Sequence, residues 1–316
     1  MNKRLLIGGM AALSILLLFA AYFRLNDGQP TWVYQLQDAS IERIAQLPVS
    51  YAVIDATKDG QERYSIKDIT TLRDKGINPI SYLSIGEASS YLPYWQPEWG
   101  SKQKGVLTVT DSAPEWAGNV ANPDWPESVK VRYWNPEWQQ YMFEELKKIQ
   151  DAGFSGVYLD IIDAYVYWGD PTTYEEGGEQ SVPFDPVSEK EAAERMISFV
   201  RTLSAVAKER DPDFLIIPQN GEELLQFDKG SYLDAVDGIG VEDIWFNGNE
   251  KNPSDEIEAR LKWLRQFTEA DKPVFSVDYA KGRFSINRYY RACRNEKFYC
   301  FAAAPDRSLS SIKAFD

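Results

Sequence analysis

Short runs of apolar, β-branched and aromatic residues recur along the chain, separated by segments that carry helix start and stop signals. Runs of this length, bounded by polar turns, are typical of buried β-strands. We predict eight strands, at Trp32–Gln37, Tyr51–Asp55, Pro79–Gly86, Gly156–Asp160, Leu215–Asn220, Val236–Glu242, Pro273–Tyr279 and Phe298–Ala303.

The helix signals lie between these strands. Ser65 is placed to cap a helix that ends at Gly76, and Asn135 followed by a proline begins a helix that Gly153 ends. Ser188 and Glu191 have the spacing of a capping box, for a helix that runs to about Lys208. Two further helices are predicted, with Ser254 opening Asp255–Thr268 and Ser285 opening Ile286–Arg291.

This alternation of eight strands with helices predicts one (β/α)8 TIM barrel over residues 29–316. A doubly wound open sheet is the main alternative. Such sheets usually carry a glycine-rich phosphate loop after the first strand, whereas Gln37-Asp38-Ala39-Ser40 follow it here and no GxGxxG or GxxxxGK[ST] motif occurs. The sequence therefore favours the barrel.

Residues 1–28 form a separate segment. Lys3 and Arg4 precede an apolar run from Leu5 to Phe23, which is typical of an export signal. The run is near the minimum length for a spanning helix, and Ala20-Ala21 is a weak cleavage site. Both a cleaved signal peptide and a retained N-terminal membrane anchor stay open. We expect a monomer in the cell envelope, periplasmic or extracellular, touching the membrane only through this segment.

Charge and residue usage exclude several classes of function. The chain has 34 Lys and Arg against 48 Asp and Glu, a net charge of −14, which disfavours binding to nucleic acid. It contains no histidine, which removes Ser-His-Asp triads, Cys-His pairs and HExxH zinc sites. Chemistry near neutral pH must then be done by Asp, Glu, Lys, Tyr or a bound ion, and we expect no dedicated metal site and no cofactor. Cys293 and Cys300 are predicted to form a disulfide, two buried thiols being the alternative.

Two connections that follow strands are unusually long, Glu87–Val131 and Ile161–Val187. In a TIM barrel such connections lie at the C-terminal face, where active sites are built. Their flat aromatic rings suit stacking on sugars, although we expect most of them to pack the loops, with two or three facing a cleft. The aromatic residues are Trp95, Trp99, Trp116, Trp125, Tyr165, Tyr167, Trp168 and Tyr174.

Acidic residues stand at or near the ends of five predicted strands: Asp55, Glu87, Asp160, Glu242 and Asp278. One such acid could simply cap the next helix, but five converging on one rim indicate a site. Side-chain alternation places Gly238, Gly240 and Glu242 on one strand face, and the glycines would leave open volume beneath the acid. Two carboxylates on nearby strands suit cleavage of a glycosidic bond.

Several motifs together resemble glycoside hydrolase family 114, the endo-α-1,4-polygalactosaminidases, which is related to the hydrolase domain of the Pel polysaccharide protein. The matching segments are Tyr51–Gly60, Ile80–Tyr91, Val131–Gln139, Gly153–Asp163, Pro218–Leu225, Asp237–Gly248 and Phe275–Ala280.

The resemblance implies a (β/α)8 barrel acting on an α-1,4-linked galactosamine polymer, with Asp160 as nucleophile and Glu242 as acid/base. It further implies sugar-binding roles for Asp55, Tyr82, Glu87, Asn220, Asp278 and Tyr279. A deacetylated polymer is cationic, so the acids near the site are expected to attract it; these are Glu87, Asp163, Asp243 and Asp278.

We accordingly expect a retaining, endo-acting glycosidase of a galactosamine-containing polysaccharide. The alternative is a catalytically silent carbohydrate-binding barrel of the cell envelope, in which the acids only hydrogen-bond sugar hydroxyls. A metal-dependent polysaccharide deacetylase is disfavoured because such enzymes usually need histidine ligands, and the chain has none.

Overall fold

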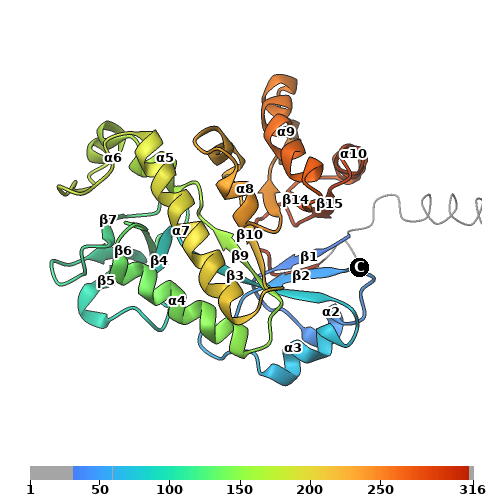
Figure 1. Ribbon diagram of the computed structural model, residues 1–316, viewed down its shortest axis with the longest axis horizontal. Helices are drawn as coiled ribbons and strands as arrows, with labels where there is room; N and C mark the ends of the chain where they lie inside the picture. Colours follow the sequence, from blue (N-terminus) through green and yellow to red (C-terminus); the bar gives the residue numbers. More distant parts are fainter. Residues whose placement is uncertain (1–30, 59, 313–316) are drawn as a thin grey trace, which may run out of the picture.

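Eight parallel strands occupy the centre of the molecule, and helices surround them (Figure 1). The computed structural model describes residues 31–58 and 60–312. Neighbouring strands pair in parallel in two sheets, in the orders β1-β2-β3-β9-β10 and β11-β14-β15. The strands are β1 (Val33–Gln35), β2 (Tyr51–Ile54), β3 (Asn78–Ser84), β9 (Gly156–Asp160), β10 (Leu215–Pro218), β11 (Ile239–Glu242), β14 (Val274–Asp278) and β15 (Tyr299–Ala302).

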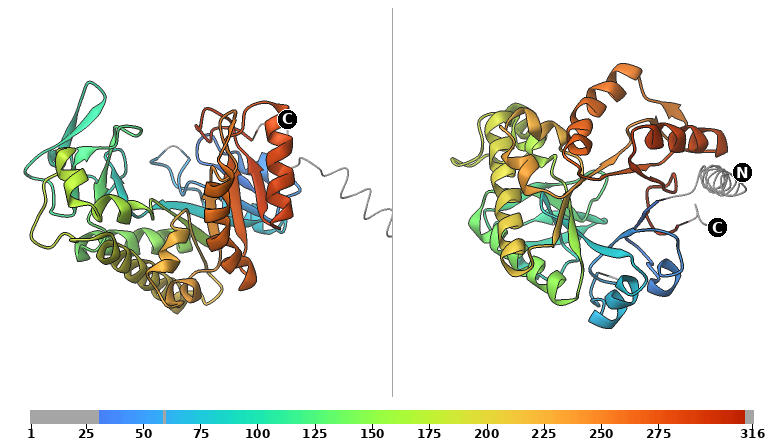
Figure 2. Two further views of the ribbon diagram at one scale, coloured as in Figure 1. Left: turned by 90° about the horizontal axis from the view of Figure 1, so that it is seen from above. Right: turned by 45° about the vertical axis from the view of Figure 1, so that its right-hand side comes forward.

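Two seams of backbone hydrogen bonds join these sheets into a closed barrel. Between β10 and β11, the Asn220 N–H donates to the Gly240 carbonyl at 2.8 Å. Between β15 and β1, the Thr31 N–H donates to the Cys300 carbonyl at 3.0 Å. The right-hand view of Figure 2 shows the helices arranged around the strands. All eight predicted strands coincide with barrel strands, and the predicted fold class is confirmed.

The helices between the strands begin mostly where their capping residues predict. Ser65, Asn135 and Ser188 each accept a backbone hydrogen bond from the first turn of the helix that follows. The helices are α2 (Ile41–Ile44), α3 (Ile66–Arg73), α4 (Pro136–Asp151), α7 (Glu189–Arg210), α8 (Ser231–Ala235), α9 (Ser254–Glu269) and α10 (Arg283–Asn295).

Two of the predicted helix starts and one predicted capping box need correction. The Glu191 carboxylate accepts the Val187 N–H at 3.1 Å rather than closing the box on Ser188. Ser254 is the first residue of α9 and does not cap it, and Ser285 lies inside α10, which begins at Arg283. Gly282, with a φ of +84°, sets the start of α10 in place of a side-chain cap.

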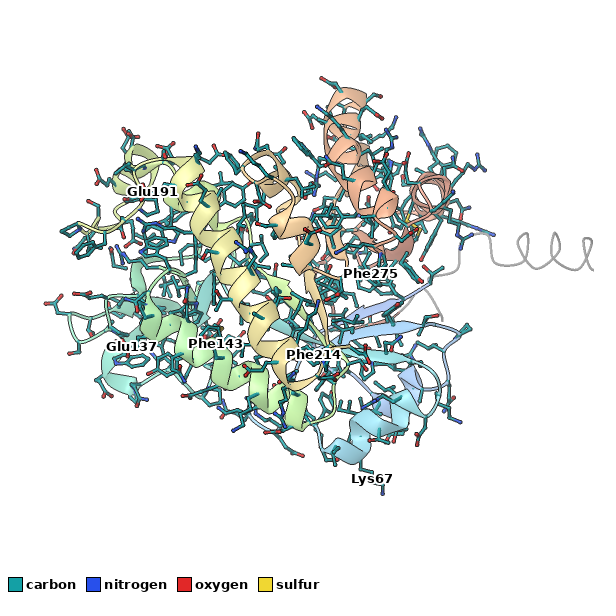
Figure 3. The ribbon with its side chains drawn as sticks, in the orientation of Figure 1. Lys67, Glu137, Phe143, Glu191, Phe214 and Phe275 are labelled. Carbon is teal, nitrogen blue, oxygen red and sulfur yellow. A yellow bond between two sulfur atoms is a disulfide. The ribbon has the colours of Figure 1, made fainter. Side chains whose placement is uncertain are left out.

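Aromatic side chains fill the interior of the barrel. Trp32 packs edge-on against Phe275, with ring centroids 5.4 Å apart, and stacks on Tyr34 at 5.6 Å. Tyr34 in turn contacts Tyr158 of β9 at 5.3 Å. Phe275 is labelled in Figure 3, among the strands of the second sheet. TIM barrels are more often filled with branched aliphatic residues; here, rings form a solid floor beneath the C-terminal ends of the strands.

This floor corrects the expectation of open volume beneath Glu242. A Cβ atom added to Gly240 would lie 1.8 Å from the Tyr158 hydroxyl, so the ring of Tyr158 occupies the space that the glycine frees. A Cβ atom added to Gly238 would lie 2.8 Å from the Pro273 carbonyl oxygen and 3.4 Å from the Phe275 ring. Gly240 therefore admits the protein's own Tyr158 ring and Gly238 lies against the backbone of the next strand, so neither glycine opens space for a ligand.

The long connection after β3 is a small antiparallel domain at one end of the barrel (Figure 2, left). Its strands form a three-stranded sheet and a hairpin; they are β4 (Glu87–Ser89), β5 (Gly100–Gln103), β6 (Val106–Val109), β7 (Ala117–Ala121) and β8 (Ser128–Val131). The Trp116 ring is fully buried and packs on Trp99 at 5.5 Å and on Trp138 of α4 at 4.9 Å. Most loop aromatics thus form a satellite core, whereas Trp125 is 55% exposed.

The connection after β9 contains two short helices, α5 (Ala164–Trp168) and α6 (Pro171–Glu176). Arg132 directly follows β8 of the three-stranded sheet β4-β8-β7, here called the inserted sheet. It forms a bidentate ion pair with Asp185, at 2.7 and 3.1 Å, and lies 4.8 Å above the Trp168 ring. This buried contact fastens the two long connections to each other.

Two further sequence predictions concern the chain's covalent and membrane features. Cys293 of α10 and Cys300 of β15 form a disulfide. The predicted signal or anchor, residues 1–28, lies outside the described residues. Within the described part of the chain, no helix combines the length and the apolar character needed to cross a membrane.

The close contact at Gly240 predicts the effect of a single methyl group. We expect Gly240→Ala to lower the free energy of unfolding by about 1–3 kcal/mol or more, because the added Cβ overlaps the Tyr158 ring. Thermal unfolding measures this. Gly177→Ala is the matched control, since Gly177 has a φ of −72° and its added Cβ would come no closer than 3.3 Å to another atom. Equal melting temperatures for Gly240→Ala and the parent would contradict the proposed packing.

Candidate active site

Asp160 is the last residue of β9, and its carboxylate is held by two donors. The Tyr82 hydroxyl donates to Oδ2 at 2.6 Å, and the Ile161 N–H donates to Oδ1 at 2.7 Å. Tyr82 comes from the neighbouring strand β3, where it is paired in register with Tyr158. Asp160 points to the same side of β9 as Tyr158, above the aromatic floor.

Glu242 is the last residue of β11 and is held in a similar way. The Tyr279 hydroxyl, just beyond β14, donates to Oε2 at 3.0 Å. The backbone is fixed from behind, since the Glu242 N–H contacts Asn220 Oδ1 at 3.4 Å and the Arg260 guanidinium donates to the Glu242 carbonyl at 2.7 Å. Arg260 is itself paired with the buried Glu222 at 2.5 Å. Each acid therefore has one tyrosine hydroxyl as a partner.

A single strand, β10, separates the two acids. Neighbouring strands lie about 4.8 Å apart, so the backbones of β9 and β11 are about 10 Å apart and their inward side chains approach each other over Tyr158. Burial raises the pKa of Asp160 to about 7, and the charge of Glu242 adds to this effect. Burial also raises the pKa of Glu242. The arrangement favours a pair that retains one proton up to near-neutral pH.

The backbone leaves each of these strands in an unusual conformation. Ile161 follows β9 with a φ of +59°, Asn220 follows β10 with +58°, and Asp243 follows β11 with +54°. A β-branched residue in the left-handed region is a genuine outlier, and each such residue costs on the order of 1–3 kcal/mol. Backbone strain of this kind concentrates at functional sites, and here it lies directly beside the two acids.

Three other predicted acids follow the ends of β2, β3 and β9, and two of them have partners of their own. The Asp55 carboxylate accepts the N–H and hydroxyl of Thr57, at 2.8 and 2.7 Å. Glu87 is buried and forms an ion pair with Lys130 of the inserted sheet. Asp163 is exposed at the start of α5. The charge of Glu87 is therefore already neutralised by Lys130.

The structure separates Asp278 from this group. Alternation along β14 turns Tyr279 toward the barrel interior and places Asp278 on the opposite face with Ser276, whose carbonyl accepts a bond from the Tyr289 hydroxyl of α10. Asp278 has no exposed surface, and its Oδ2 accepts the Phe246 N–H at 3.1 Å. Contact with a sugar would require the segment after β11 to move.

Three residues that the sequence analysis did not single out also belong to the site: Glu222, Arg260 and Arg307. Arg307 pairs with Asp243 at 2.5 Å and lies over the Tyr279 ring. Helix α9 and the segment after β15 supply the two arginines, and no local pattern marks them. Within residues 31–58 and 60–312, no group of three acidic or cysteine side chains is arranged to hold a metal ion.

The burial of Asp278 gives a pH-dependent stability that can be measured. Burial raises its pKa to about 8, with the charge of Asp243 as the second cause. The folded state therefore holds this proton more tightly than the unfolded chain, whose aspartate pKa is about 3.9. Stability is full below that value and is lost as pH rises toward 8.

We expect the free energy of unfolding of Asp278→Asn, which carries no titrating proton, to exceed that of the parent by a few kcal/mol at pH 9, with the difference narrowing toward pH 4. Urea unfolding from pH 4 to 9 measures it, and Asp170→Asn, at the exposed start of α6, is the control. A gap that stays constant with pH would contradict the assignment.

The chain is similar in sequence to a known protein family and to proteins of other organisms. The model of glycoside-hydrolase family GH114 matches residues 20–311. An uncharacterized protein of Methanocaldococcus jannaschii is 35% identical over 301 residues, covering 92% of this chain and 80% of that protein. An uncharacterized protein of Thermotoga maritima is 34% identical over 294 residues, covering 90% and 84%.

Solved structures share the fold. The glycoside hydrolase domain of PelA from Pseudomonas aeruginosa superposes with a TM-score of 0.61 at 17% identity, covering 89% of this chain and 96% of that domain. Ega3 of Aspergillus fumigatus, solved in complex with galactosamine, superposes with a TM-score of 0.60 at 18% identity, covering 88% and 92%. With its closed barrel, its paired acids and a family match across almost its whole length, the chain belongs to glycoside-hydrolase family GH114 and is a glycosidase.

Proposed function

We propose that this glycosidase is an endo-acting, retaining hydrolase of α-1,4-linked galactosamine-containing polysaccharide, with Asp160 as nucleophile and Glu242 as acid/base. The observation that carries the proposal is the pair of carboxylates at the ends of β9 and β11, each hydrogen-bonded to one tyrosine hydroxyl. Cleavage of a glycosidic bond needs two carboxyl groups, one as nucleophile and one as acid/base, and the two acids above the buried aromatic rings can supply them.

In the first step the Asp160 carboxylate attacks the anomeric carbon while Glu242 donates its proton to the departing glycosidic oxygen. A covalent glycosyl-enzyme forms, and the C–O bond to the leaving chain breaks. Glu242, now ionised, then removes a proton from water, whose oxygen attacks the anomeric carbon and releases Asp160. Two inversions restore the original anomeric configuration, and a carboxyl separation of about 5–5.5 Å is what this route requires.

The protonation of the pair fits these roles. Burial of Asp160 and the charge of Glu242 hold one proton on the pair to about pH 7. The developing positive charge at the anomeric carbon favours the ionised form of Asp160 beside it, which places the proton on Glu242. The Tyr82 hydroxyl and the Ile161 N–H also stabilise the Asp160 carboxylate. Activity is then expected to fall as the pair loses its last proton.

The proposed substrate is supported by the charge of the chain and by its similarity in fold to a solved structure. Ega3, which shares the fold, was solved with galactosamine. The chain's net charge of −14 suits a cationic polymer. Local attraction is weaker than the sequence suggests, because Glu87 pairs with Lys130, Asp243 pairs with Arg307 and Asp278 is buried. Among the acids expected to attract the polymer, Asp163 stays exposed.

Residues 1–28 carry the remaining part of the proposal. Their basic start and apolar run support export to the cell envelope, either anchored or secreted, where a polysaccharide substrate is present. We propose that the barrel acts there as a monomer.

Removing either acid tests the proposed mechanism. We expect Asp160→Asn and Glu242→Gln to lower kcat on partly deacetylated α-1,4-galactosamine polymer by about 10²–10⁴-fold or more while keeping the parent's melting temperature. Release of short oligosaccharides, followed by mass spectrometry, measures this and reports endo action. Glu223→Gln is the matched control, because Glu223 is exposed on the segment after β10. Parental turnover by both acid variants would show that the site lies elsewhere.

Salt tests the electrostatic part separately. Ionic strength shortens the Debye length from about 30 Å at 0.01 M to about 3 Å at 1 M. We expect KM for the deacetylated polymer to rise over this range, and KM for the fully acetylated polymer to change little. The measurement is steady-state kinetics on both polymers in parallel. An equal response of the two polymers would remove charge attraction as a determinant of binding.

A further inference from the structure

Residues 303–312 form a segment that is hydrogen-bonded to the barrel backbone at two places. The segment after β15 crosses from β15 to β1 at the C-terminal ends of the strands. It is fixed at its start, where the Ala303 N–H donates to the Asp278 carbonyl at 3.0 Å. It is fixed again where the Leu309 carbonyl accepts the Leu36 N–H at 2.9 Å and the Gln37 N–H at 3.2 Å. A side chain carried between these two points is therefore held over one sector of the rim.

Arg307 is that side chain, and it has three neighbours in the site. Its guanidinium carbon lies 4.2 Å from the centroid of the Tyr279 ring. Its Nη2 pairs with Asp243 Oδ2 at 2.5 Å. The Tyr279 hydroxyl donates to Glu242 Oε2 at 3.0 Å, and Asp243 directly follows Glu242 in the chain. Arg307 therefore contacts both Tyr279, which is hydrogen-bonded to Glu242, and Asp243, which follows Glu242 in the chain.

The contact is closer than that of Arg288, and the ring beneath it is buried. Arg288 lies 5.5 Å from the Phe284 ring, which is 73% exposed. The Tyr279 ring beneath Arg307 is only 3% exposed. Because the Arg307 side chain is itself 44% exposed, the ion pair to Asp243 contributes little stability. Its geometric effect is the larger one, since it fixes a buried ring whose hydroxyl is bonded to the acid.

We propose that Arg307 is a positioning residue for Glu242: it clamps the Tyr279 ring and, through Asp243, the backbone after β11, and so sets the orientation and the proton affinity of the acid/base. The inference rests on the proposed function, because it assigns Glu242 that role. Arg307 touches no reacting atom in this scheme and acts only through Tyr279, Asp243 and its charge.

The other charged and titratable groups around Glu242 set the sign of the effect. Asp160 and Tyr158 face it from β9, Tyr279 faces it from the end of β14, and Asp243 adjoins it. Arg260 of α9 bonds its carbonyl and is already paired with Glu222. Burial raises the pKa of Glu242 and Asp243 adds to this, whereas the positive charge of Arg307 opposes both. Removing that charge therefore makes the pair hold its proton to higher pH.

The test is Arg307→Met, which keeps much of the length and loses the charge and the planar group. On a polymer that the parent cleaves, we expect the upper pH midpoint of kcat/KM to rise by about 0.5–1 and kcat at the optimum to fall about tenfold, with KM little changed. Arg307→Lys should return the pH midpoint toward the parent while recovering kcat only in part, because lysine restores the charge and not the planar stack. Arg288→Met is the control for loss of a surface arginine over a ring.

A double-mutant cycle with Tyr279→Phe separates clamping from a general surface effect. If Arg307 acts through the Tyr279 hydroxyl, its loss should cost less kcat in the Tyr279→Phe background than in the parent. An unchanged pH midpoint with additive losses would overturn the proposal, as would a rise in KM alone, which would make Arg307 a substrate contact.

A readout without substrate keeps this inference distinct from the proposed function. The carboxyl pKa of Glu242 can be followed by ¹³C NMR, with Glu242→Gln to assign the signal. We expect Arg307→Met to raise it and Arg288→Met to leave it in place. An unchanged value would overturn the role of Arg307 whatever polymer is cleaved, whereas a parent that is inactive on galactosamine polymers would count against the proposed function alone.

Discussion

The packing of aromatic rings inside the barrel is the constraint on which the site depends. Trp32, Tyr34 and Tyr158 fill the space below the strand ends, so water is excluded beneath the two acids. This exclusion is the first cause of the raised pKa of both Asp160 and Glu242. The same packing demands a residue without a side chain at Gly240, where the Tyr158 ring lies against the backbone. The same rings thus fill the barrel core and raise the pKa of the two acids.

Above this floor, each acid is oriented by contacts from elements distant in sequence. Tyr82 holds Asp160 and Tyr279 holds Glu242, and both tyrosines come from strands next to the one that carries the acid. Behind Glu242, Arg260 reaches in from α9, and Arg307 reaches in from the segment after β15. The strained backbone after these strands is maintained by such contacts, because isolated left-handed residues would otherwise relax.

Predictions from local sequence succeeded where a local pattern carried the information. All eight strands were found, because buried strands of a barrel are short apolar runs bounded by turns. The errors have specific causes. Ser254 and Ser285 look like helix caps, yet their helices begin at or before them, with Pro253 and Gly282 in the N-cap positions. Asp278 ends a strand like the other acids, but alternation turns it to the outer face, where Phe246 donates to it.

The sequence by itself determined the barrel and the family resemblance, and it predicted the pair Asp160 and Glu242, since strand period and strand-end position follow from neighbouring residues alone. It could not determine what surrounds them. Whether Gly240 opens a cavity or admits a ring depends on Tyr158, which lies 82 positions earlier in the chain. Whether an acid is free or neutralised, as for Glu87 beside Lys130, likewise depends on which segments the closed barrel brings together. The charge and the free volume at the barrel rim depend on side chains from segments far apart in the sequence, and only the tertiary structure brings those side chains together.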